Sequence, residues 1–216
     1  NIVMGVYSGK TLLKSWRVRT ERNTTEDEFN ILVTNLFSAS GFMLNKIEKT
    51  LVSCVVPPMV TILDSFCRKY LGHAPRWVNA KSYAKMPIRI FNPSELGADR
   101  IVNAVAAYHK YQTSLIIIDF GTATTFDAVS EKGEYLGGAI SPGITIASEA
   151  LFLKASKLPR IEIFEPPEHV VGKDTGQSLK AGIIYGYAGL VDGIVKRMKA
   201  EMGTDPKIVA DRKSVV

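Results

Sequence analysis

The sequence of 216 residues has few of the residues that build disulfide frameworks and zinc centres. It contains only two cysteines, Cys54 and Cys67, and three histidines that lie far apart, His73, His109 and His169. Neither set shows the spacing typical of disulfide-rich domains, zinc sites or Cys–His nucleophile pairs. We therefore expect a protein of a reduced, cytoplasmic compartment.

Long apolar runs are also absent. No segment approaches the roughly 20 apolar residues of a membrane-spanning helix, and the sequence shows no signal peptide pattern. We therefore expect no membrane association. The chain begins at Asn1, without a methionine and directly inside an apolar stretch, so we expect the natural protein to begin upstream of this residue.

Basic residues outnumber acidic residues by 27 to 21, which gives a net charge of +6. The lysines and arginines stand singly among acidic residues and form no basic block. This pattern favours a mixed, solvated surface that attracts small anions over a nucleic-acid-binding face. With 46% apolar residues the chain can bury a substantial core, as one large domain or as two small ones.

The stretch from Ser114 to Gly143 carries the strongest chemical signal. The apolar run Leu115–Ile118 ends in Asp119, and a turn of small and hydroxyl residues follows, GTATT. A buried strand that delivers a carboxylate to such a turn suits a phosphate or cation site, because glycine lets the backbone approach an anion and the turn amides can point at its oxygens. The alternative is that Asp119 only closes a strand turn, but that role does not require the hydroxyl residues.

Two further segments contain candidate residues. In PSELGADR, Asp99 lies near a helix start, where the dipole favours an ionised acid, and Arg100 offers a fork for phosphate or carboxylate. On composition alone, an ordinary helix-start acid beside a solvated arginine is the stronger interpretation. Asp174 and Thr175 open a long predicted helix, and by themselves they fit a plain helix cap.

Hydrophobic periodicity and turn residues predict a mixed series of strands and helices. Strands are expected at 2–7, 11–19, 49–56, 76–79, 115–118, 124–130, 134–140 and 207–210. Helices are expected at about 25–40, 57–70, 92–111, 143–157 and 174–202. Asp127 alternates with Phe126 on one of the strands, so it faces either a cleft or solvent.

A faint internal repeat is present. A strand, a short glycine turn, a second strand and a helix start occur in that order twice, in NIVMGVYSGKTLLKSW and in TTFDAVSEKGEYLGGA. Such a duplication is one way to build a two-lobed nucleotide-binding protein. The sequence is equally compatible with two unrelated hairpins.

Taken together, the motifs resemble those of the type III pantothenate kinases. The segments that carry the resemblance are NPSELGADRIVNAVAAY, DFGTATTFD, GGAISPGITIASEAL, KLPRIEI and VVGKDTGQSLKAGIIYGY. With SCVVPP and TEDEF, they extend the resemblance over nearly all of the chain from Asn1 to Ala210. The combination of GADR, DFGTATT and GGAI is highly specific, whereas a single glycine motif would not be.

This resemblance implies an α/β fold with duplicated actin-like (ribonuclease H-like) lobes, each a mixed sheet flanked by helices, and a cleft between the lobes. We expect the lobes at residues 1–112 and 113–216. The family's activity is transfer of the γ-phosphate of ATP to pantothenate, the first step of coenzyme A synthesis. The resemblance also implies potassium or ammonium, Mg²⁺ bound with ATP, and a homodimer without a nucleic-acid partner.

Residues at the family's motif positions are expected to take the family's roles. Asp99 is expected as the general base, and Asp119 as the ligand of the monovalent cation. The expected pantothenate contacts are Gly97, Ala98, Asp99, Arg100 and Thr175, the last in a pocket completed across a dimer interface. The expected ATP contacts are Asn1, Ile2, Val3 and Thr122.

Three features depart from the family pattern. The first phosphate motif, D-x-GNTN, would end at Asn1, and the strand KIVA runs into DRKSVV where a TGG turn is usual. Ile90, with Phe91 beside it, stands where the family usually has a pocket tyrosine. We expect missing segments at both ends to explain the first two departures. The alternatives are a non-catalytic nucleotide-binding regulatory protein of the same fold and a kinase for another small alcohol.

Overall fold

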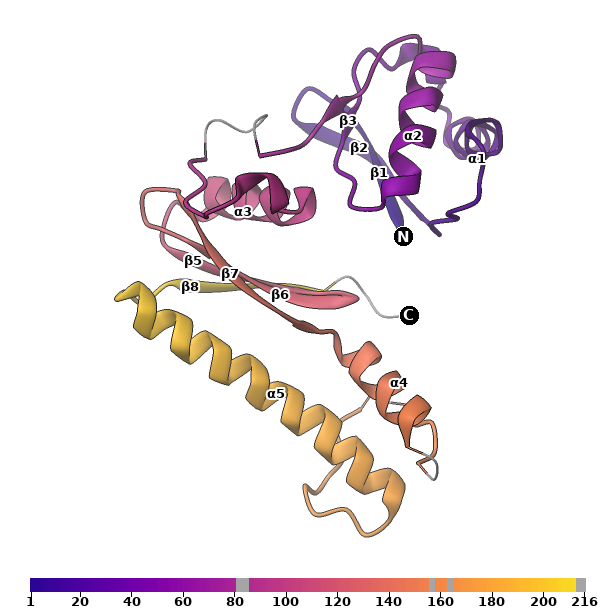
Figure 1. Ribbon diagram of the computed structural model, residues 1–216. Coiled ribbons are helices and arrows are strands. Elements are labelled where there is room, and N and C mark those ends of the chain that lie inside the picture. Colours follow the sequence, from indigo (N-terminus) through magenta and orange to yellow (C-terminus); the bar gives the residue numbers. More distant parts are fainter. Residues whose placement is uncertain (81–85, 156–157, 163–164, 213–216) are drawn as a thin grey trace. The chain divides into compact units, whose positions relative to one another are not determined.

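The computed structural model describes residues 1–80, 86–155, 158–162 and 165–212, which form a mixed α/β protein (Figure 1). The chain divides into two compact units, Asn1–Ser82 and Tyr83–Val216, and each is described by itself. The boundary between these units precedes the helix at 98–111, whereas the expected lobes divide at residue 112. The expected lobes are two copies of one fold, whereas the two units are defined only by their compactness, so the lobe division at residue 112 stays a prediction.

The first unit contains a β-hairpin, two main helices and a short parallel strand pair. Its elements are β1 (Ile2–Ser8), β2 (Thr11–Val18), α1 (Glu26–Ser38), the 3₁₀ helix η1 (Leu44–Lys46), β3 (Leu51–Val52), α2 (Pro57–Phe66), the π-helix η2 (Cys67–Leu71) and β4 (Arg76–Trp77). β1 and β2 pair antiparallel, and β3 and β4 pair parallel. The predicted hairpin and both predicted helices are confirmed.

α1 begins at a capping box. The Thr25 hydroxyl oxygen accepts the backbone N–H of Glu28 at 3.2 Å, and the Glu28 carboxylate accepts the backbone N–H of Thr25 at 2.8 Å. Two N–H groups that a helix start leaves without intrahelical partners are satisfied in this way. The sequence TTEDE therefore determines where this helix begins.

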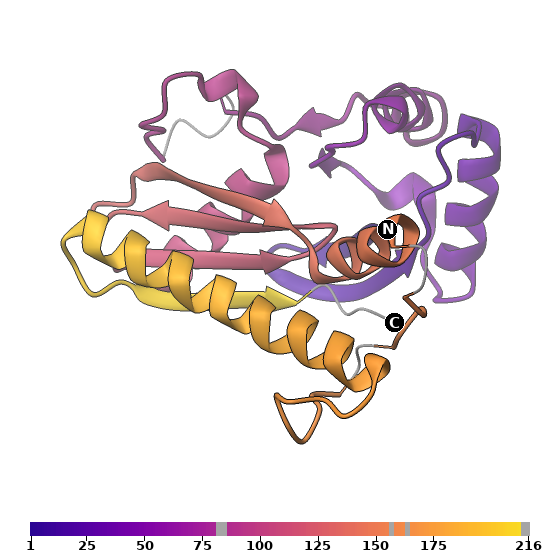
Figure 2. The same cartoon turned by 60° about the horizontal axis from the view of Figure 1, so that its bottom comes forward.

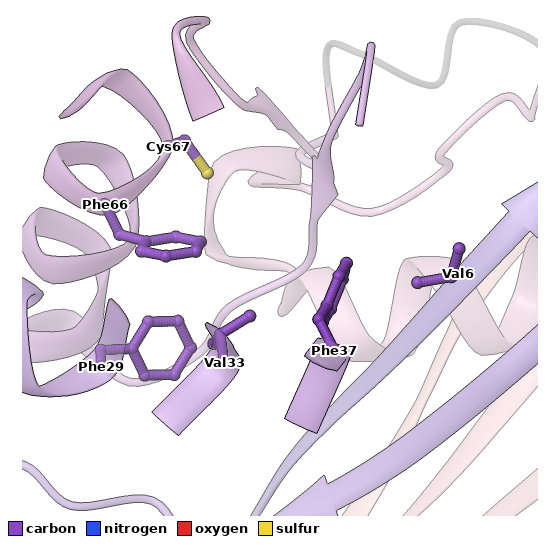
Figure 3. Packing of buried hydrophobic residues seen from close by; sticks show 6 residues of the cluster. All are labelled: Val6, Phe29, Val33, Phe37, Phe66 and Cys67. Carbon is purple, nitrogen blue, oxygen red and sulfur yellow. The ribbon is translucent and has the colours of Figure 1, made fainter. Parts of the chain in front are cut away.

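Aromatic residues fill the core of the first unit (Figure 3). The rings of Phe29 and Phe66 lie edge to face with centroids 5.1 Å apart, a favourable arrangement of their quadrupoles. The two rings belong to different helices, since Phe29 lies on α1 and Phe66 is the last residue of α2, so this contact packs the two helices together. The buried cluster comprises Val6, Phe29, Val33, Phe37, Phe66 and Cys67.

The strand predicted at 49–56 is mostly wrong. Only Leu51 and Val52 form a strand, and they pair only with the two residues of β4. Leu51 is 62% exposed and Val55 is 55% exposed, so this apolar run is not the continuously buried strand that its composition suggests. An apolar run becomes a long strand only where neighbouring strands pair with it along its length.

The second unit is a four-stranded sheet with helices on both faces. Its elements are the 3₁₀ helix η3 (Pro93–Glu95), α3 (Ala98–Tyr111), β5 (Leu115–Phe120), β6 (Ala123–Val129), β7 (Tyr135–Pro142), α4 (Ile144–Lys154), α5 (Thr175–Met202) and β8 (Lys207–Arg212). The strand order is β7-β6-β5-β8, with β5 antiparallel to β6 and parallel to β8. These elements confirm the prediction within a few residues; the last two residues of the helix expected to 157 lie outside the described residues.

α3 and α5 lie on opposite faces of this sheet (Figures 1 and 2). Ile116, Ile118 and Phe126 pack against the C-terminal half of α5, and the alternate residues of β5 face α3. A strand covered on both sides has to be apolar throughout, which accounts for the run LIII that precedes Asp119.

The turn between β6 and β7 requires glycine at position 133. Gly133 has φ of +76°, and a Cβ there would lie 2.5 Å from the ring of Tyr108 on α3. The Tyr108 hydroxyl also donates a hydrogen bond to the carbonyl of Glu131 at 2.9 Å. Tyr108 therefore holds α3 against this hairpin.

We expect Gly133→Asn to destabilise the second unit by about 2–4 kcal/mol, because asparagine tolerates positive φ but its Cβ collides with Tyr108. The matched control is Gly203→Asn at the C-cap of α5, where φ is +63° and no atom lies within 4 Å of a Cβ. That change should cost less than about 1 kcal/mol. Urea unfolding followed by circular dichroism measures both, and equal costs would contradict the proposed role of Tyr108.

Candidate active site

Asp119 lies at the end of β5 on the sheet face covered by α3. Its side chain is only 6% exposed, and its Oδ2 accepts a hydrogen bond from Nδ2 of Asn103 on α3 at 3.1 Å. Asn103 follows Asp99 by four residues, so both side chains lie on one face of α3, one turn apart. Asp99 and Asp119 therefore belong to one neighbourhood, and Asn103 links them.

Asp99 is the second residue of α3. Its Oδ1 accepts the backbone N–H of Arg100 at 2.8 Å, one of the N–H groups that the first turn leaves without an intrahelical partner. Gly97 is the N-cap and provides no side-chain cap. The carboxylate of Asp99 thus takes over part of the capping while it stays half-buried.

The turn after β5 brings the start of α4 close. The backbone N–H of Gly143, the N-cap of α4, donates to the carbonyl of Thr122 at 3.0 Å. A Cβ at Gly143 would lie 2.3 Å from the carbonyl oxygen of Gly121, so only glycine allows this approach. The exposed Thr122 and the N-terminus of α4, which has no side-chain cap, therefore present hydroxyl and N–H donors side by side.

A second carboxylate, Asp127 of β6, is fully buried beside this neighbourhood. Its Oδ1 accepts hydrogen bonds from Arg100 Nε and from the Tyr135 hydroxyl, at 2.7 Å and 2.5 Å. The expectation that Asp127 faces a cleft or solvent is wrong, because the side chain is 0% exposed. The cause is the register: Asp127 pairs with Ile117 and shares the α3-covered face of the sheet.

The surroundings of Asp127 act on its charge in opposite directions. Burial raises the pKa of the Asp127 carboxyl, while the Tyr135 hydroxyl and the Arg100 guanidinium lower it, and burial is the larger effect. Burial and the neighbouring carboxylate also raise the pKa of the Tyr135 hydroxyl above its usual range. Tyr135 therefore stays a neutral hydrogen-bond donor.

Thr175 is the first residue of α5 and is exposed. Asp174 caps the helix by accepting the N–H of Gln177 at 2.8 Å, which confirms the predicted cap. Thr175 also lines a cavity of about 390 Å³ between α4 and α5, whose other walls are mostly apolar side chains, including Leu151, Leu179 and Ile183. Thr175 thus lies at the start of α5, whereas Asp99 lies on α3 and Asp119 on β5.

The remaining candidates lie in separate places. Asn1 precedes β1 in the first unit, and Ile2 and Val3 are the first residues of β1, where they pair with Val18 and Arg17 of β2. Ile90 packs toward Gly137 of β7, while Phe91 is fully exposed.

The donor atoms suit hard cations. Within the described part of the chain, no group of three or more histidine, cysteine, aspartate or glutamate residues gathers as a metal centre. Asp119 offers a buried carboxylate, one oxygen of which accepts the amide N–H of Asn103, and carboxylate oxygens are ligands that hard cations prefer. Among the described helices none is long and apolar enough to cross a membrane.

Sequence reasoning missed several partners of these residues. It did not identify Asn103, Tyr135 or Tyr187, whose hydroxyl forms a hydrogen bond with the Thr124 hydroxyl. The spacing of four residues between Asp99 and Asn103 was a readable signal of a shared helix face. The pairing of Arg100 with Asp127 needs the tertiary fold and has no sequence signal.

The family comparison and the individual relatives point to the same protein family. Residues 1–197 match the family described as type III pantothenate kinase. A relative of that name from Desulfatibacillum aliphaticivorans is 60% identical over 210 residues, which cover 97% of this chain and 82% of the relative. Relatives of the same name from Desulforapulum autotrophicum and Desulfosudis oleivorans are 59% and 55% identical, over 97% of this chain and 80% and 82% of their own.

The raised pKa of Asp127 predicts a pH dependence of stability. Between the usual aspartate pKa near 3.9 and the folded-state value, the folded protein keeps a proton that the unfolded chain has lost. Stability contributed by this group is therefore full below about pH 3.9 and is lost as the pH rises through the folded pKa. Asp127→Asn cannot titrate and should gain stability relative to the unmodified protein over that window.

Urea unfolding of both proteins from about pH 3 to 7, followed by circular dichroism, tests this. The difference between the two unfolding free energies should level off once the pH exceeds the folded pKa. A difference that instead moves in favour of the unmodified protein as the pH rises would show that the ion pair outweighs burial.

Proposed function

The chain belongs to the type III pantothenate kinase family, and from that membership we propose that it transfers the γ-phosphate of ATP to the primary alcohol of pantothenate, the first step of coenzyme A synthesis. The observation that supports a site at the end of β5 is the hydrogen bond from Asn103 to Asp119. It joins α3, which carries Asp99 in its first turn, to β5, which carries Asp119 next to its last residue.

In this proposal Asp99 is the general base. A carboxylate with a pKa near 4 does not deprotonate an alcohol in advance, but it orients the hydroxyl and accepts the proton as the oxygen–phosphorus bond forms. The bond between the γ-phosphorus and the bridging oxygen breaks in the same step, and ADP leaves. The transition state of such transfers is loose, so correct positioning contributes most of the acceleration.

The other residues bind the two substrates. We assign Gly97, Ala98, Arg100 and Thr175 to pantothenate, and Asn1, Ile2, Val3 and Thr122 to ATP. The Thr122 hydroxyl and the N-terminus of α4 support a phosphate position, because N–H donors and the positive end of a helix dipole attract anions. Gly97 supports a backbone approach, since it carries no side chain beside the first turn of α3.

Two cations belong to this reaction. Mg²⁺ accompanies ATP, as in kinases generally, and Asp119 would hold potassium or ammonium. The monovalent cation would offset the negative charge that gathers on the phosphates. The buried carboxylate of Asp119 offers the oxygen ligands and the negative charge that such an ion takes.

Two features of the fold support further parts of the proposal. Each unit contains an antiparallel hairpin followed by a helix, β1–β2–α1 in the first and β6–β7–α4 in the second. This order supports duplicated actin-like lobes. Seven of the eleven residues of α4 are apolar although none is buried, and Leu153 on it is 75% exposed. An exposed apolar helix of this kind supports a homodimer formed through α4 and the neighbouring part of α5.

The kinase proposal predicts that the full-length protein releases ADP from ATP only when pantothenate and potassium or ammonium are present. Asp99→Asn should lower kcat by about 100- to 10,000-fold, because the general base is lost. Asp119→Asn should remove the dependence on the monovalent cation. Asp205→Asn, at a side chain that is 89% exposed, is the matched control and should keep full activity.

A coupled ADP assay with pantothenate and other small alcohols measures these effects. Nucleotide binding without ADP release under any condition would favour a regulatory protein. Release that depends on another alcohol would point to a different substrate.

The dimer proposal predicts that Leu153→Asp yields a monomer. A charge in the centre of an apolar interface is left desolvated and without a partner, which typically costs several kcal/mol. Ile31→Asp is the matched control, because Ile31 is a helical residue that is 60% exposed on α1. Analytical ultracentrifugation should show a dimer for the unmodified protein and for the control. If Leu153→Asp also stays dimeric, α4 is not the interface.

A further inference from the structure

We propose that Asp127 is a positioning residue for phosphoryl transfer, which acts through Arg100 to hold the first turn of α3 and with it Asp99. This inference rests on the proposed function, since it takes Asp99 as the general base. Asp127 itself touches neither substrate in this proposal.

The contacts of Asp127 support an anchor. The carboxylate is 0% exposed and lies in the middle of β6, a strand paired on both sides. Arg100 Nε and one Arg100 Nη both lie 2.7 Å from its Oδ1. The Tyr135 hydroxyl donates to the same oxygen at 2.5 Å, and the Thr125 hydroxyl donates to Oδ2 at 3.3 Å. Few side chains of the described chain are held by so many donors at once.

The guanidinium of Arg100 is confined from the other side as well. Only 16% of its side chain is exposed, and it lies over the ring of Tyr135, 5.9 Å from the centroid. A Cβ at Gly138 of β7 would approach its Nη to 2.9 Å, so a glycine makes room for it. Arg100 is therefore fixed against two strands of the sheet.

This anchor attaches directly to the proposed base. Arg100 follows Asp99 in the chain, and its backbone N–H donates to Asp99 Oδ1 at 2.8 Å. The first turn of a helix has fewer hydrogen bonds than its interior, and Gly97 adds no side-chain cap. Without the pair to Asp127, this weakly bonded turn would lose the ion pair that ties it to the middle of the sheet, one residue from Asp99.

Stability alone does not account for the ion pair. A buried pair gains little over a neutral substitute, since both charges lose their hydration. The raised pKa of Asp127 agrees with a net cost of burial. A role in orienting Asp99 explains why a charged pair occupies this place. Experiments can distinguish this role from a role in folding.

The central test is Asp127→Asn in the full-length protein, with kinetics and amide hydrogen exchange measured on the same preparation. We expect kcat to fall by about 10- to 100-fold, the loss typical of removing a group that orients a reacting residue. The KM for ATP should stay within about twofold, because the change alters positioning and leaves nucleotide contacts in place. Exchange protection of the β5 and β6 amides should stay unchanged.

Substitutions of Arg100 test whether Asp127 acts through Arg100. At saturating pantothenate, which removes any loss of substrate binding by Arg100 from the comparison, Arg100→Met should lower kcat as Asp127→Asn does. The double variant should then lose no more than either single variant, since both break one link. Arg100→Lys keeps a charge without the fork and should fall between the unmodified protein and Arg100→Met. Glu134→Gln is the matched control: it breaks an exposed pair with Arg89, also 2.7 Å long, and should leave kcat unchanged.

Each outcome has one meaning. If the unmodified protein does not phosphorylate pantothenate, the proposed function fails. If it does and Asp127→Asn keeps full kcat, the positioning role is wrong. Loss of kcat together with loss of exchange protection would make Asp127 a structural residue only. Losses that multiply in the double variant would show that Asp127 does not act through Arg100.

Discussion

The sheet of the second unit is covered on both faces, and this constraint decides which polar side chains can meet. A carboxylate on the α3 side of the sheet has little access to water and must find donors within the protein. Asp119 and Asp127 both lie on that side, and α3 supplies a donor to each, Asn103 and Arg100. The same helix carries Asp99 in its first turn. One helix packed on one sheet face thus brings three carboxylates together.

Much of the fold could be predicted from the sequence, because local signals decide it. The capping box at Thr25, the paired prolines at the start of α2 and the turn at Gly133 each act within a few residues. The prediction was wrong at 49–56, where composition suggested a long buried strand. Burial there depends on partners elsewhere in the chain, and only two residues of β4 pair with this run.

Part of the candidate site could likewise be predicted from the sequence, and part could not. The motif that includes Asp119 was recognisable because its residue types suit the chemistry, whereas Asp99 was identified as a candidate base only through the resemblance to the kinase family. The role of Asp127 was not, since alternation along a strand shows only that Phe126 and Asp127 face opposite sides. Which side is covered by which helix follows from the packing of α3 and α5. The pairing of Arg100 with Asp127 could not be predicted either, because the sequence around Arg100 indicates only a residue that can bind an anion, and the buried carboxylate beside it lies 27 positions away in the chain.

The three carboxylates have different surroundings, and the differences fit different tasks. Asp99 is half-buried at a helix start, so its carboxylate is accessible to a substrate. Asp119 is buried and accepts a hydrogen bond from Asn103 of α3, and Asp127 is enclosed by several donors. Phosphoryl transfer needs little covalent help from the protein, but a misplacement of about 1 Å can lower its rate about 100-fold. A carboxylate on the least hydrogen-bonded turn of a helix is held in place better when a fixed point lies nearby, and Asp127 in the middle of a sheet covered on both faces provides one.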